Sequence, residues 1–302
     1  MFNLNGIGAS GKVRGGPKLT LMLKIGTSGY SYDDWKGIVY PESLSKKGFL
    51  DHYRKFFDIT EINSTYYRLP SPGMFVNILK KVPDDFQFVV KLSKELTHER
   101  EKAEDAIDEY KKGIKPLVES GQLVTLLAQF PYSFKPNEST YSHLKFLRDS
   151  MPDLPINVEF RNEYWINDET FDFLEEHSLG YVCVDMPRLP RLVPPVVKAT
   201  TELGYIRFHG RVKKYWWNPP EPHMRYDYSY NREELAEWVG KTRELENYTE
   251  NIVILFNNHF QGKSAKNAKE FASMLNQDGE GEEISEKDDF LHPGRDLFSS
   301  QS

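Results

Sequence analysis

Two charged side chains stand close together in an apolar segment of the sequence. Residues 156–161 read INVEFR, which places Glu159 and Arg161 two positions apart. In a β-strand, side chains two positions apart share a face, so we expect these two to lie side by side. An arginine held in this way can bind a carboxylate or phosphate through its planar guanidinium group. The glutamate can orient the arginine or transfer a proton.

Polar side chains also stand near the ends of other apolar segments, which suggests one shared polar site. Lys91 and Asp185 are in such positions, and with Glu159 they are our candidates for catalysis. The candidates for substrate binding are Arg161, Arg207, His209, Asn63, Gln129, Asn257, Ser28 and Tyr30. Because Lys91, Arg161 and Arg207 are cations, this site favours a small anionic ligand, such as a phosphorylated sugar or a nucleotide fragment.

The segment 211–230, RVKKYWWNPPEPHMRYDYSY, combines six aromatic with four basic side chains. Such a segment can stack on rings and contact phosphate groups. It can equally pack its aromatic rings on the protein beneath it. In both cases it is suited to cover a site, as active-site lids do, and we assign Trp216, Trp217 and Tyr226 to this lid.

The same polar residues also have structural explanations. A satisfied pair such as Glu159 and Arg161 can set the register of a strand, and Lys91 can extend its ammonium group to solvent. These explanations stay open for each residue taken alone. The convergence of so many polar groups at one rim favours a functional site.

A metal-dependent hydrolase or nuclease is the first alternative function. It requires three or more converging His, Asp or Glu ligands. The sequence offers Glu61, Glu159, Asp185, His209 and His259. No HxH, HExxH or DxD spacing stands at a strand end, and the neighbouring cations would repel a metal ion. We therefore predict neither a metal nor another cofactor.

Eight short apolar segments with high β-propensity carry these residues. They span 23–30, 59–67, 86–92, 124–130, 156–161, 181–186, 205–210 and 251–259. Most are continuous apolar runs, as in strands that are covered on both faces. Helical patterns follow seven of them. The sixth is followed by a proline-rich stretch, 186–201, where we expect a short or distorted helix.

This alternation of strand and helix predicts a single-domain (β/α)8 TIM barrel with a long aromatic-basic loop after the seventh strand. An open, doubly wound sheet shares the local pattern and is the alternative fold. In a barrel the active site lies at the carboxyl ends of the strands, which is where the polar residues stand.

Composition sets the limits of this domain. Of the 302 residues, 39% are hydrophobic, which is enough for a large core. No run of 18 apolar residues occurs, so we expect no membrane span, and the single cysteine fits a reducing cytoplasm. We expect 1–21 to be a disordered leader and 276–302, with eight acids and two bases, to be a disordered acidic tail. The barrel would then span 22–275, with both ends dispensable for folding.

Seven motifs, taken in order, resemble one known family. They read GTSGYSYDDW (26–35), EINSTYYRLP (61–70), VKLSKELTH (90–98), LLAQFP (126–131), VEFRNEYW (158–165), RFHG (207–210) and LFNNHFQGKSAKNA (255–268). From about residue 24 to 275 the sequence resembles the YecE-like family, also called domain of unknown function 72. The resemblance implies a TIM barrel without an established activity. Endonuclease IV and xylose isomerase, which have related barrels, are metal enzymes, but this is an analogy of fold alone.

Whether the protein is an enzyme stays open, because hydrolase, lyase and isomerase chemistry on an anionic substrate all fit these residues. A non-enzymatic module for single-stranded nucleic acid is the second alternative. The aromatic-basic segment favours it, whereas a net charge of −6 argues against a broad basic surface. A small anionic molecule is therefore the expected partner, and the sequence does not predict the oligomeric state.

Overall fold

The computed structural model describes residues 22–277 and residue 290. Eight parallel strands form a closed barrel in sequence order, and β1 pairs with β8 to close it. The strands are β1 (Met22–Thr27), β2 (Ile59–Ile62), β3 (Gln87–Lys91), β4 (Leu123–Gln129), β5 (Ile156–Glu159), β6 (Gly180–Asp185), β7 (Leu203–Phe208) and β8 (Asn251–Phe256). The predicted TIM barrel is confirmed, and the open doubly wound sheet is not the fold.

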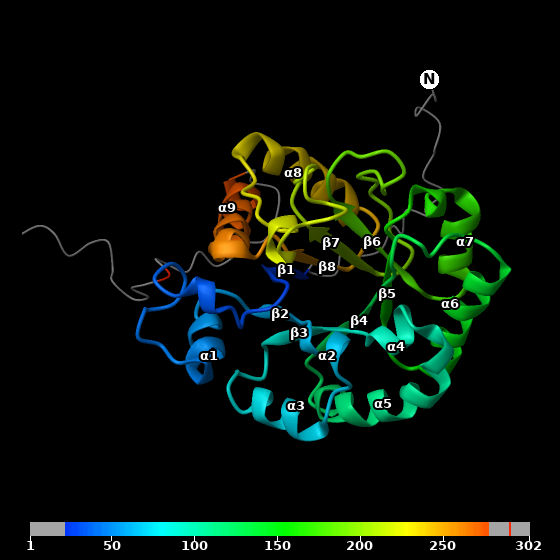
Figure 1. Ribbon diagram of the computed structural model, residues 1–302, viewed down its shortest axis with the longest axis horizontal. Helices are drawn as coiled ribbons and strands as arrows, with labels where there is room; N and C mark the ends of the chain where they lie inside the picture. The colour runs from blue at the N-terminus through cyan, green and yellow to red at the C-terminus, as the bar shows by residue number, and fades with distance from the viewer. Residues whose placement is uncertain (1–21, 278–289, 291–302) are drawn as a thin grey trace, which may run out of the picture.

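Helices surround the barrel, as Figure 1 shows. The α-helices are α1 (Phe49–Tyr53), α2 (Ser64–Tyr67), α3 (Pro72–Leu79), α4 (Lys94–Thr97), α5 (Ala103–Glu119), α6 (Glu138–Ser150), α7 (Asp168–Glu176), α8 (Arg232–Glu246) and α9 (Lys263–Gln277). Short 3-10 helices are η1 (Asp33–Trp35), η2 (Lys46–Gly48), η3 (Arg100–Lys102), η4 (Glu163–Trp165), η5 (Pro222–Arg225) and η6 (Phe260–Gly262). Residues 186–202, all of them described, form no helix, so the short or distorted helix expected after the sixth strand is absent. Among the described helices, none has a stretch long and apolar enough to cross a lipid bilayer.

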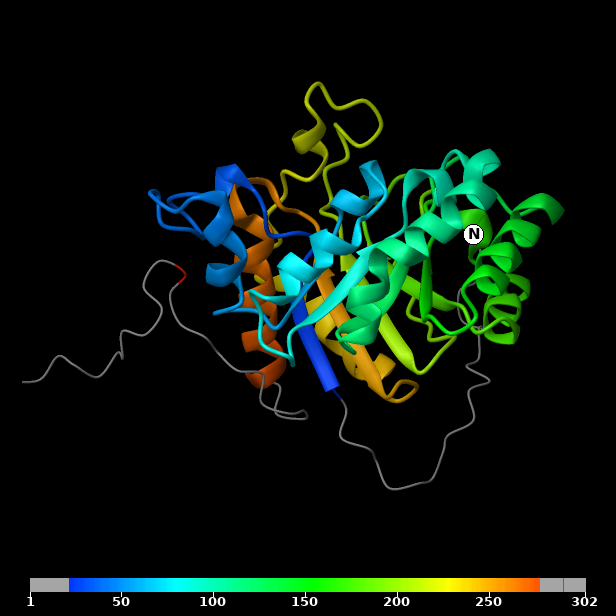
Figure 2. The same ribbon diagram turned by 90° about the horizontal axis from the view of Figure 1, so that it is seen from below.

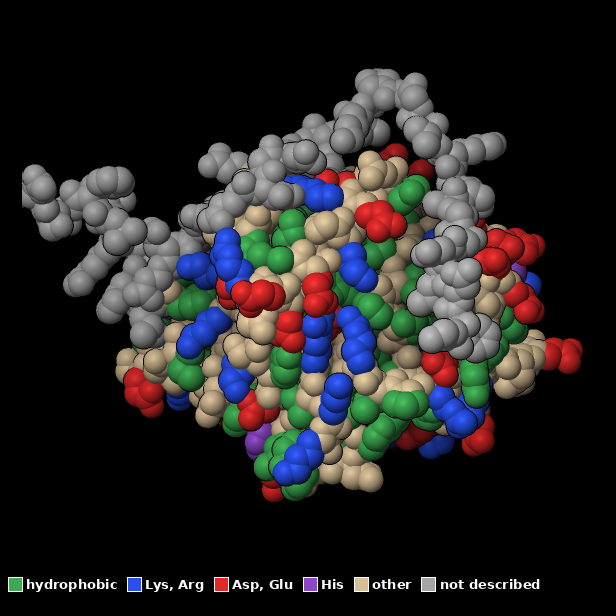
Figure 3. All heavy atoms as spheres, turned by 90° about the horizontal axis from the view of Figure 1, so that it is seen from above, with side chains coloured by type: hydrophobic (Ala, Val, Ile, Leu, Met, Phe, Trp, Pro, Cys, Tyr) green, Lys and Arg blue, Asp and Glu red, His purple; other side chains and the backbone are tan. Residues whose placement is uncertain are grey.

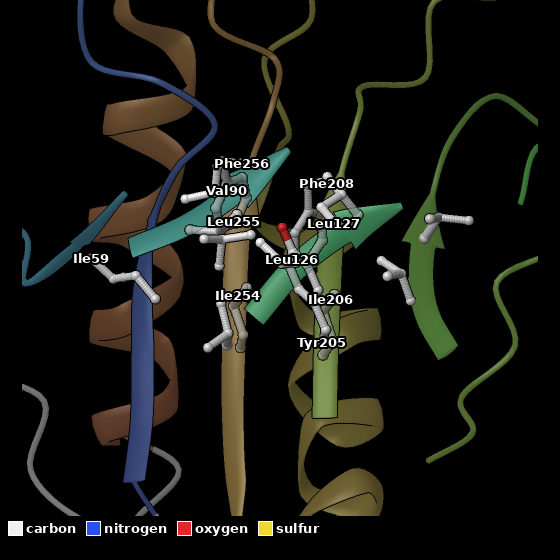
Figure 4. Close-up of a cluster of buried hydrophobic side chains, with 14 of the residues drawn as sticks. Ile59, Val90, Leu126, Leu127, Tyr205, Ile206, Phe208, Ile254, Leu255 and Phe256 are labelled. Atoms are coloured by element: carbon white, nitrogen blue, oxygen red, sulfur yellow. The ribbon is translucent and has the colours of Figure 1, made fainter. Parts of the chain in front are cut away.

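Apolar side chains from β2, β3, β4, β7 and β8 pack together in the wall of the barrel (Figure 4). The fully buried members include Ile59, Val90, Leu127, Ile206 and Phe256. Burying a side chain of this size stabilises a fold by about 1.5–3 kcal/mol relative to its exposure. The continuous apolar runs of the sequence are thus explained by strands that are covered on both faces.

The backbones of β1 and β2 approach each other closely at Gly26. A Cβ atom at this position would lie 2.3 Å from the carbonyl oxygen of Ile59. Only glycine fits such a contact. The next residue, Thr27, pairs with Thr60, so the ends of the two strands stay in register.

The loop between β7 and α8 stands above the carboxyl ends of the strands (Figure 2). It starts at Gly210, whose φ of 84° favours glycine and whose N–H donates to the Tyr230 hydroxyl at 2.8 Å. An ion pair between Lys263 and Asp227 ties the loop to α9. The predicted long loop therefore covers the end of the barrel at which the site was expected.

The predicted leader, 1–21, lies outside the described residues, as does the predicted tail apart from 276, 277 and 290. Phe290 is 8% exposed, and its ring lies 5.0 Å from that of Phe56. Its carbonyl oxygen is 2.7 Å from Nε2 of His52 in α1. At this residue the tail contacts the segment around α1, and the dispensability of the tail for folding stays a prediction.

Candidate functional site

A buried arginine on β7 connects three other strands across the barrel interior. The side chain of Arg207 is 1% exposed and pairs with Glu61 on β2, at 2.6 Å, and with Glu159 on β5. Its Nη2 also donates to Oγ of Ser28, which directly follows β1, at 3.2 Å. Because β7 is adjacent to none of these strands in the barrel, the bonds must cross its interior.

Glu159 has three basic neighbours. Its Oε1 lies 2.6 Å from Nη2 of Arg161 and 3.2 Å from Nε2 of His209, and its Oε2 pairs with Arg207. Burial opposes ionisation of this carboxyl group, but Arg161 and Arg207 outweigh that effect and hold its pKa well below the usual range. Glu159 is therefore a carboxylate at neutral pH.

His209 is uncharged in this environment. Burial, and then the neighbouring Arg161, lower its pKa to about 3. Its Nδ1 lies 3.0 Å from the amide nitrogen of Asn257, which directly follows β8. The imidazole therefore adds a polar group to the site but no positive charge at neutral pH.

Lys91 occupies the carboxyl end of β3. Its Nζ donates to Oε1 of Gln129, at the end of β4, at 2.8 Å. The same nitrogen lies 4.6 Å from the centre of the Tyr66 ring. Burial, and then Arg207, lower the pKa of Lys91 to about 8, so this lysine is close to titrating at neutral pH.

These residues form what we call the central cluster. Its members are Ser28, Glu61, Lys91, Gln129, Glu159, Arg161, Tyr205, Arg207, His209 and Asn257. Most were predicted as site residues from the sequence. Most of them lie at or just beyond the carboxyl ends of their strands, the end of the barrel above which the loop that follows β7 stands (Figure 2).

The loop between β7 and α8, which was predicted to be a lid, contributes a tryptophan that contacts two arginines. Trp216 is 5% exposed, and its ring lies 5.7 Å from the guanidinium carbon of Arg161 and 5.9 Å from that of Arg225. Both contacts are of the cation–π type, which holds an arginine without neutralising its charge. Trp216 therefore covers Arg161 on the side of the loop.

The other two predicted lid residues lie in different surroundings. Trp217 is 45% exposed and meets the ring of Tyr132 edge-on at 4.8 Å. Tyr226 lies 5.3 Å from the ring of His259. The loop thus packs some aromatic rings on the barrel and leaves Trp217 largely in solvent.

Asp185 does not join the central cluster, contrary to the expectation of one shared pocket. Arg211 donates to its two oxygens at 2.9 and 2.8 Å, Tyr230 donates at 2.8 Å and Trp238 at 2.7 Å. Trp238 belongs to α8, so the carboxylate points outward from the barrel. This position follows from the alternation of side chains along β6.

Two predicted binding residues lie at the edge of the site. The ring of Tyr30 lies 6.0 Å from that of Tyr53 in α1. Asn63 directly follows β2 and precedes α2, and it is half-buried. The strand ends at Ile62, so the sequence-based strand that extended to residue 67 was too long.

Two tyrosines that were not predicted from the sequence contact the cluster or its edge. Tyr205 donates to Oε2 of Glu61 at 2.7 Å. Tyr32 donates to the carbonyl oxygen of Ser28 at 2.6 Å and stacks on His259 at 4.4 Å. Tyr205 stands two positions before Arg207, and this spacing on β7 was a signal that could have identified it.

The carboxylates of the cluster are already neutralised by arginines. Glu61 and Glu159 both pair with Arg207. Within residues 22–277 and 290, no group of three or more His, Cys, Asp or Glu side chains is arranged to hold a metal ion. The first alternative function therefore finds no set of ligands in this part of the chain.

Comparison with known proteins identifies the family. Residues 24–289 match the family model described as "Protein of unknown function DUF72". The chain belongs to the DUF72 family. The match covers the whole barrel and extends beyond residue 275, where we expected the domain to end.

Three DUF72 relatives support this assignment. The UPF0759 protein YunF of Bacillus subtilis (strain 168) is 30% identical over 270 residues, which cover 84% of this chain and 95% of that protein. A crystal structure of a DUF72 family protein from Thermotoga maritima MSB8 is 41% identical, with a TM-score of 0.78, and covers 84% of this chain and 99% of the other. A DUF72 family protein from Enterococcus faecalis V583 is 27% identical, with a TM-score of 0.75, over 84% of this chain and 96% of the other.

A more distant neighbour shares the fold alone. It is a xylose isomerase-like TIM barrel protein from Mycobacterium smegmatis, crystallised in complex with magnesium. It is 12% identical, with a TM-score of 0.50, and covers 76% of this chain and 88% of the other. This likeness shows that the two proteins share a TIM-barrel fold.

Proposed function

We propose that this DUF72 protein binds a small anionic molecule, such as a phosphorylated sugar or a nucleotide fragment, at the carboxyl end of its barrel. The observation that carries the proposal is the charge of the central cluster. Its cations are Lys91, Arg161 and Arg207. Its carboxylates are Glu61 and Glu159, and His209 is neutral. One positive charge is left over in a largely buried place, where an anion would balance it.

Arg161 is the residue best placed to contact the anion. Its side chain is 11% exposed, whereas that of Arg207 is 1% exposed and bonded to two carboxylates. The Nε atom of Arg161 is buried and has no hydrogen-bond partner among the described residues. An anion that accepted a bond from this N–H would remove the cost of an unsatisfied donor.

In this proposal Glu159 positions the arginines. Its low pKa and its three basic neighbours make it a poor proton acceptor near neutral pH. Arg207 in turn holds Glu159 and Glu61 in place. The anion-binding atoms would then be those of Arg161 and Lys91, with Asn63 and Tyr32 at the edge of the site.

Thermal unfolding in the presence of anions tests the proposal. Phosphate at 100 times its Kd would stabilise the folded protein by about 2.7 kcal/mol. We expect phosphate to raise the melting temperature of the wild type more than that of Arg161→Ala. Arg161→Lys keeps the charge but loses the planar fork, so its gain should be intermediate.

The control is Lys145→Ala, which removes an exposed ion pair with Asp149 on α6. Any general salt effect on stability should be equal in this variant, the wild type and Arg161→Ala. If phosphate stabilises all of them equally, Arg161 does not bind an anion and the proposal fails.

Binding of single-stranded nucleic acid is the second candidate, because Trp217 is 45% exposed beside the basic residues of the lid loop. The side of the molecule shown in Figure 3 carries basic and acidic side chains next to one another, with no broad basic area. We therefore favour the small anion. A short oligonucleotide that bound with high affinity, and lost it in Trp217→Ala, would reverse this preference.

A further inference from the structure

Lys91 differs from the other cations of the central cluster because it has no carboxylate partner. Within the described part of the chain, no Asp or Glu forms an ion pair with Lys91, although Glu61 and Glu159 lie near enough to influence it. Both glutamates are bonded to arginines instead. The atom that accepts a hydrogen bond from Nζ is the neutral amide oxygen of Gln129.

This environment raises the fraction of Lys91 that is present as the neutral amine. Partial burial removes water from the ammonium group, and the positive charges of Arg207 and Arg161 repel it. With a pKa of about 8, roughly a quarter of the molecules carry the free amine at pH 7.5. A lysine in water, with a pKa of about 10.4, has roughly 200-fold less free amine at that pH.

We propose that Lys91 is a nucleophile that forms an imine with the carbonyl carbon of an anionic aldehyde or ketone. Its position at the carboxyl end of β3, its neutral partner Gln129 and its two arginine neighbours are the features that activate a lysine for this reaction. The inference rests on the proposed anion site and names the chemistry of its ligand.

The reaction needs no redox partner. The amine nitrogen of Lys91 attacks the carbonyl carbon, and a C–N bond forms. The carbonyl oxygen takes up the two protons of the amine and leaves as water, which gives the C=N bond of the imine. Uptake of one further proton from solvent gives the iminium ion, which withdraws electrons from the neighbouring carbon atoms.

Arg161 supplies the charge that selects an anionic carbonyl compound. It is near enough to Lys91 to lower the pKa of that lysine, and its unpartnered Nε is a free donor. A carboxylate or phosphate bound there would place the carbonyl group of the same molecule close to Lys91. The ligand class is therefore a 2-oxo acid or an open-chain sugar phosphate, and the shared feature is an anionic group beside a carbonyl group.

Reductive trapping tests this proposal on the full chain. The protein is incubated at pH 7.5 with pyruvate or with dihydroxyacetone phosphate, and sodium cyanoborohydride then reduces any iminium ion to a stable secondary amine. Peptide mass spectrometry compares modification at Lys91 with that at the exposed Lys145. From the difference in free amine we expect Lys91 to react at least about tenfold faster.

Three variants make the result specific. Arg161→Ala should slow trapping of both anionic compounds more than that of neutral glyceraldehyde, which feels only the rise in the pKa of Lys91. Lys91→Arg keeps a cation, so phosphate should still raise its melting temperature, but one equivalent of modification should be lost. Lys145→Met should trap at Lys91 as the wild type does. The faster of the two anionic compounds identifies the carboxylate or the phosphate as the preferred anion.

The outcomes separate this inference from the proposed function. If phosphate stabilises the protein through Arg161 but Lys91 is modified no faster than Lys145, the anion site stands and the imine is wrong. If phosphate stabilises every variant equally and Lys91 is not trapped preferentially, both proposals are wrong. Preferential trapping that is independent of Arg161 would overturn the assignment of the anion partner.

Discussion

Arg207 and Arg161 contact the same glutamate, but we expect their loss to affect stability very differently. Arg207 is 1% exposed and neutralises Glu61 and Glu159, which are both fully buried. Arg207→Met would leave Glu61 without a cation. Breaking a buried ion pair from one side typically costs about 3–5 kcal/mol, because the remaining charge is left without a partner.

Arg161→Ala should destabilise the protein less than Arg207→Met does. Glu159 would keep its pair with Arg207 and its contact with His209, so no buried charge would be left alone. We expect a loss of about 1 kcal/mol, as for an ordinary substitution. In a domain of this size, a loss of 1 kcal/mol lowers the melting temperature by roughly 2–4 °C. The melting temperature should therefore fall by roughly 6–20 °C in Arg207→Met and by roughly 2–4 °C in Arg161→Ala.

Urea unfolding measured at several pH values adds an independent check. The folded-state pKa of Glu159 is lowered, so its contribution to stability is present above the unfolded-state pKa of about 4.3 and is lost as the pH falls further. In Arg207→Met much of this contribution is missing. The difference in unfolding free energy between wild type and Arg207→Met should therefore be largest above about pH 5 and should shrink toward pH 3.

The surface variant Lys145→Ala is the reference and should lose at most about 0.5 kcal/mol. Equal losses for Arg161→Ala and Arg207→Met would refute the reasoning, because Arg161 would then be as structural as Arg207. A loss for Arg207→Met that did not depend on pH would show that stranded carboxylates are not its cause.

Three further predictions concern other parts of the structure. Asp185→Asn places an amide NH₂ group next to the donors of Arg211 and Trp238, so calorimetry should show that the unfolding free energy falls by about 3–5 kcal/mol. Phosphate should still stabilise this variant, and the loss of that effect would show that Asp185 belongs to the anion site. ¹⁵N NMR should show that His209 stays neutral from pH 8 to 5, and an NMR titration midpoint near pH 6.5 would contradict this. Because the folded-state pKa of about 3 lies below that of an unfolded histidine, His209 should lower the stability as the pH falls below about 6.5. Phe290→Ala should cost about 2 kcal/mol of stability in urea unfolding, and no loss would mean that the tail contact is unimportant.

The sequence alone determined the class of fold and the end of the barrel that carries the site. Eight apolar runs alternating with helical patterns suffice for this, because the period of the apolar residues reports which faces are buried. The spacing of Glu159 and Arg161 also predicted their contact, which the structure places at 2.6 Å. Arg161 lies just beyond the end of β5, so the contact follows from a local spacing of two residues and not from a distant part of the chain.

The partners of the buried charges were decided by the tertiary structure. Asp185 and Arg207 stand at the ends of neighbouring strands, yet Asp185 points outward to Trp238 and Arg207 points inward to Glu61. The direction depends on the phase of each strand in the closed barrel, and a shift of one residue reverses it. The lack of a carboxylate partner for Lys91 has the same origin, because Arg207 pairs with both glutamates and Arg161 pairs with Glu159. That competition depends on distances across the barrel, between residues far apart in the chain, and no pattern along the sequence encodes those distances.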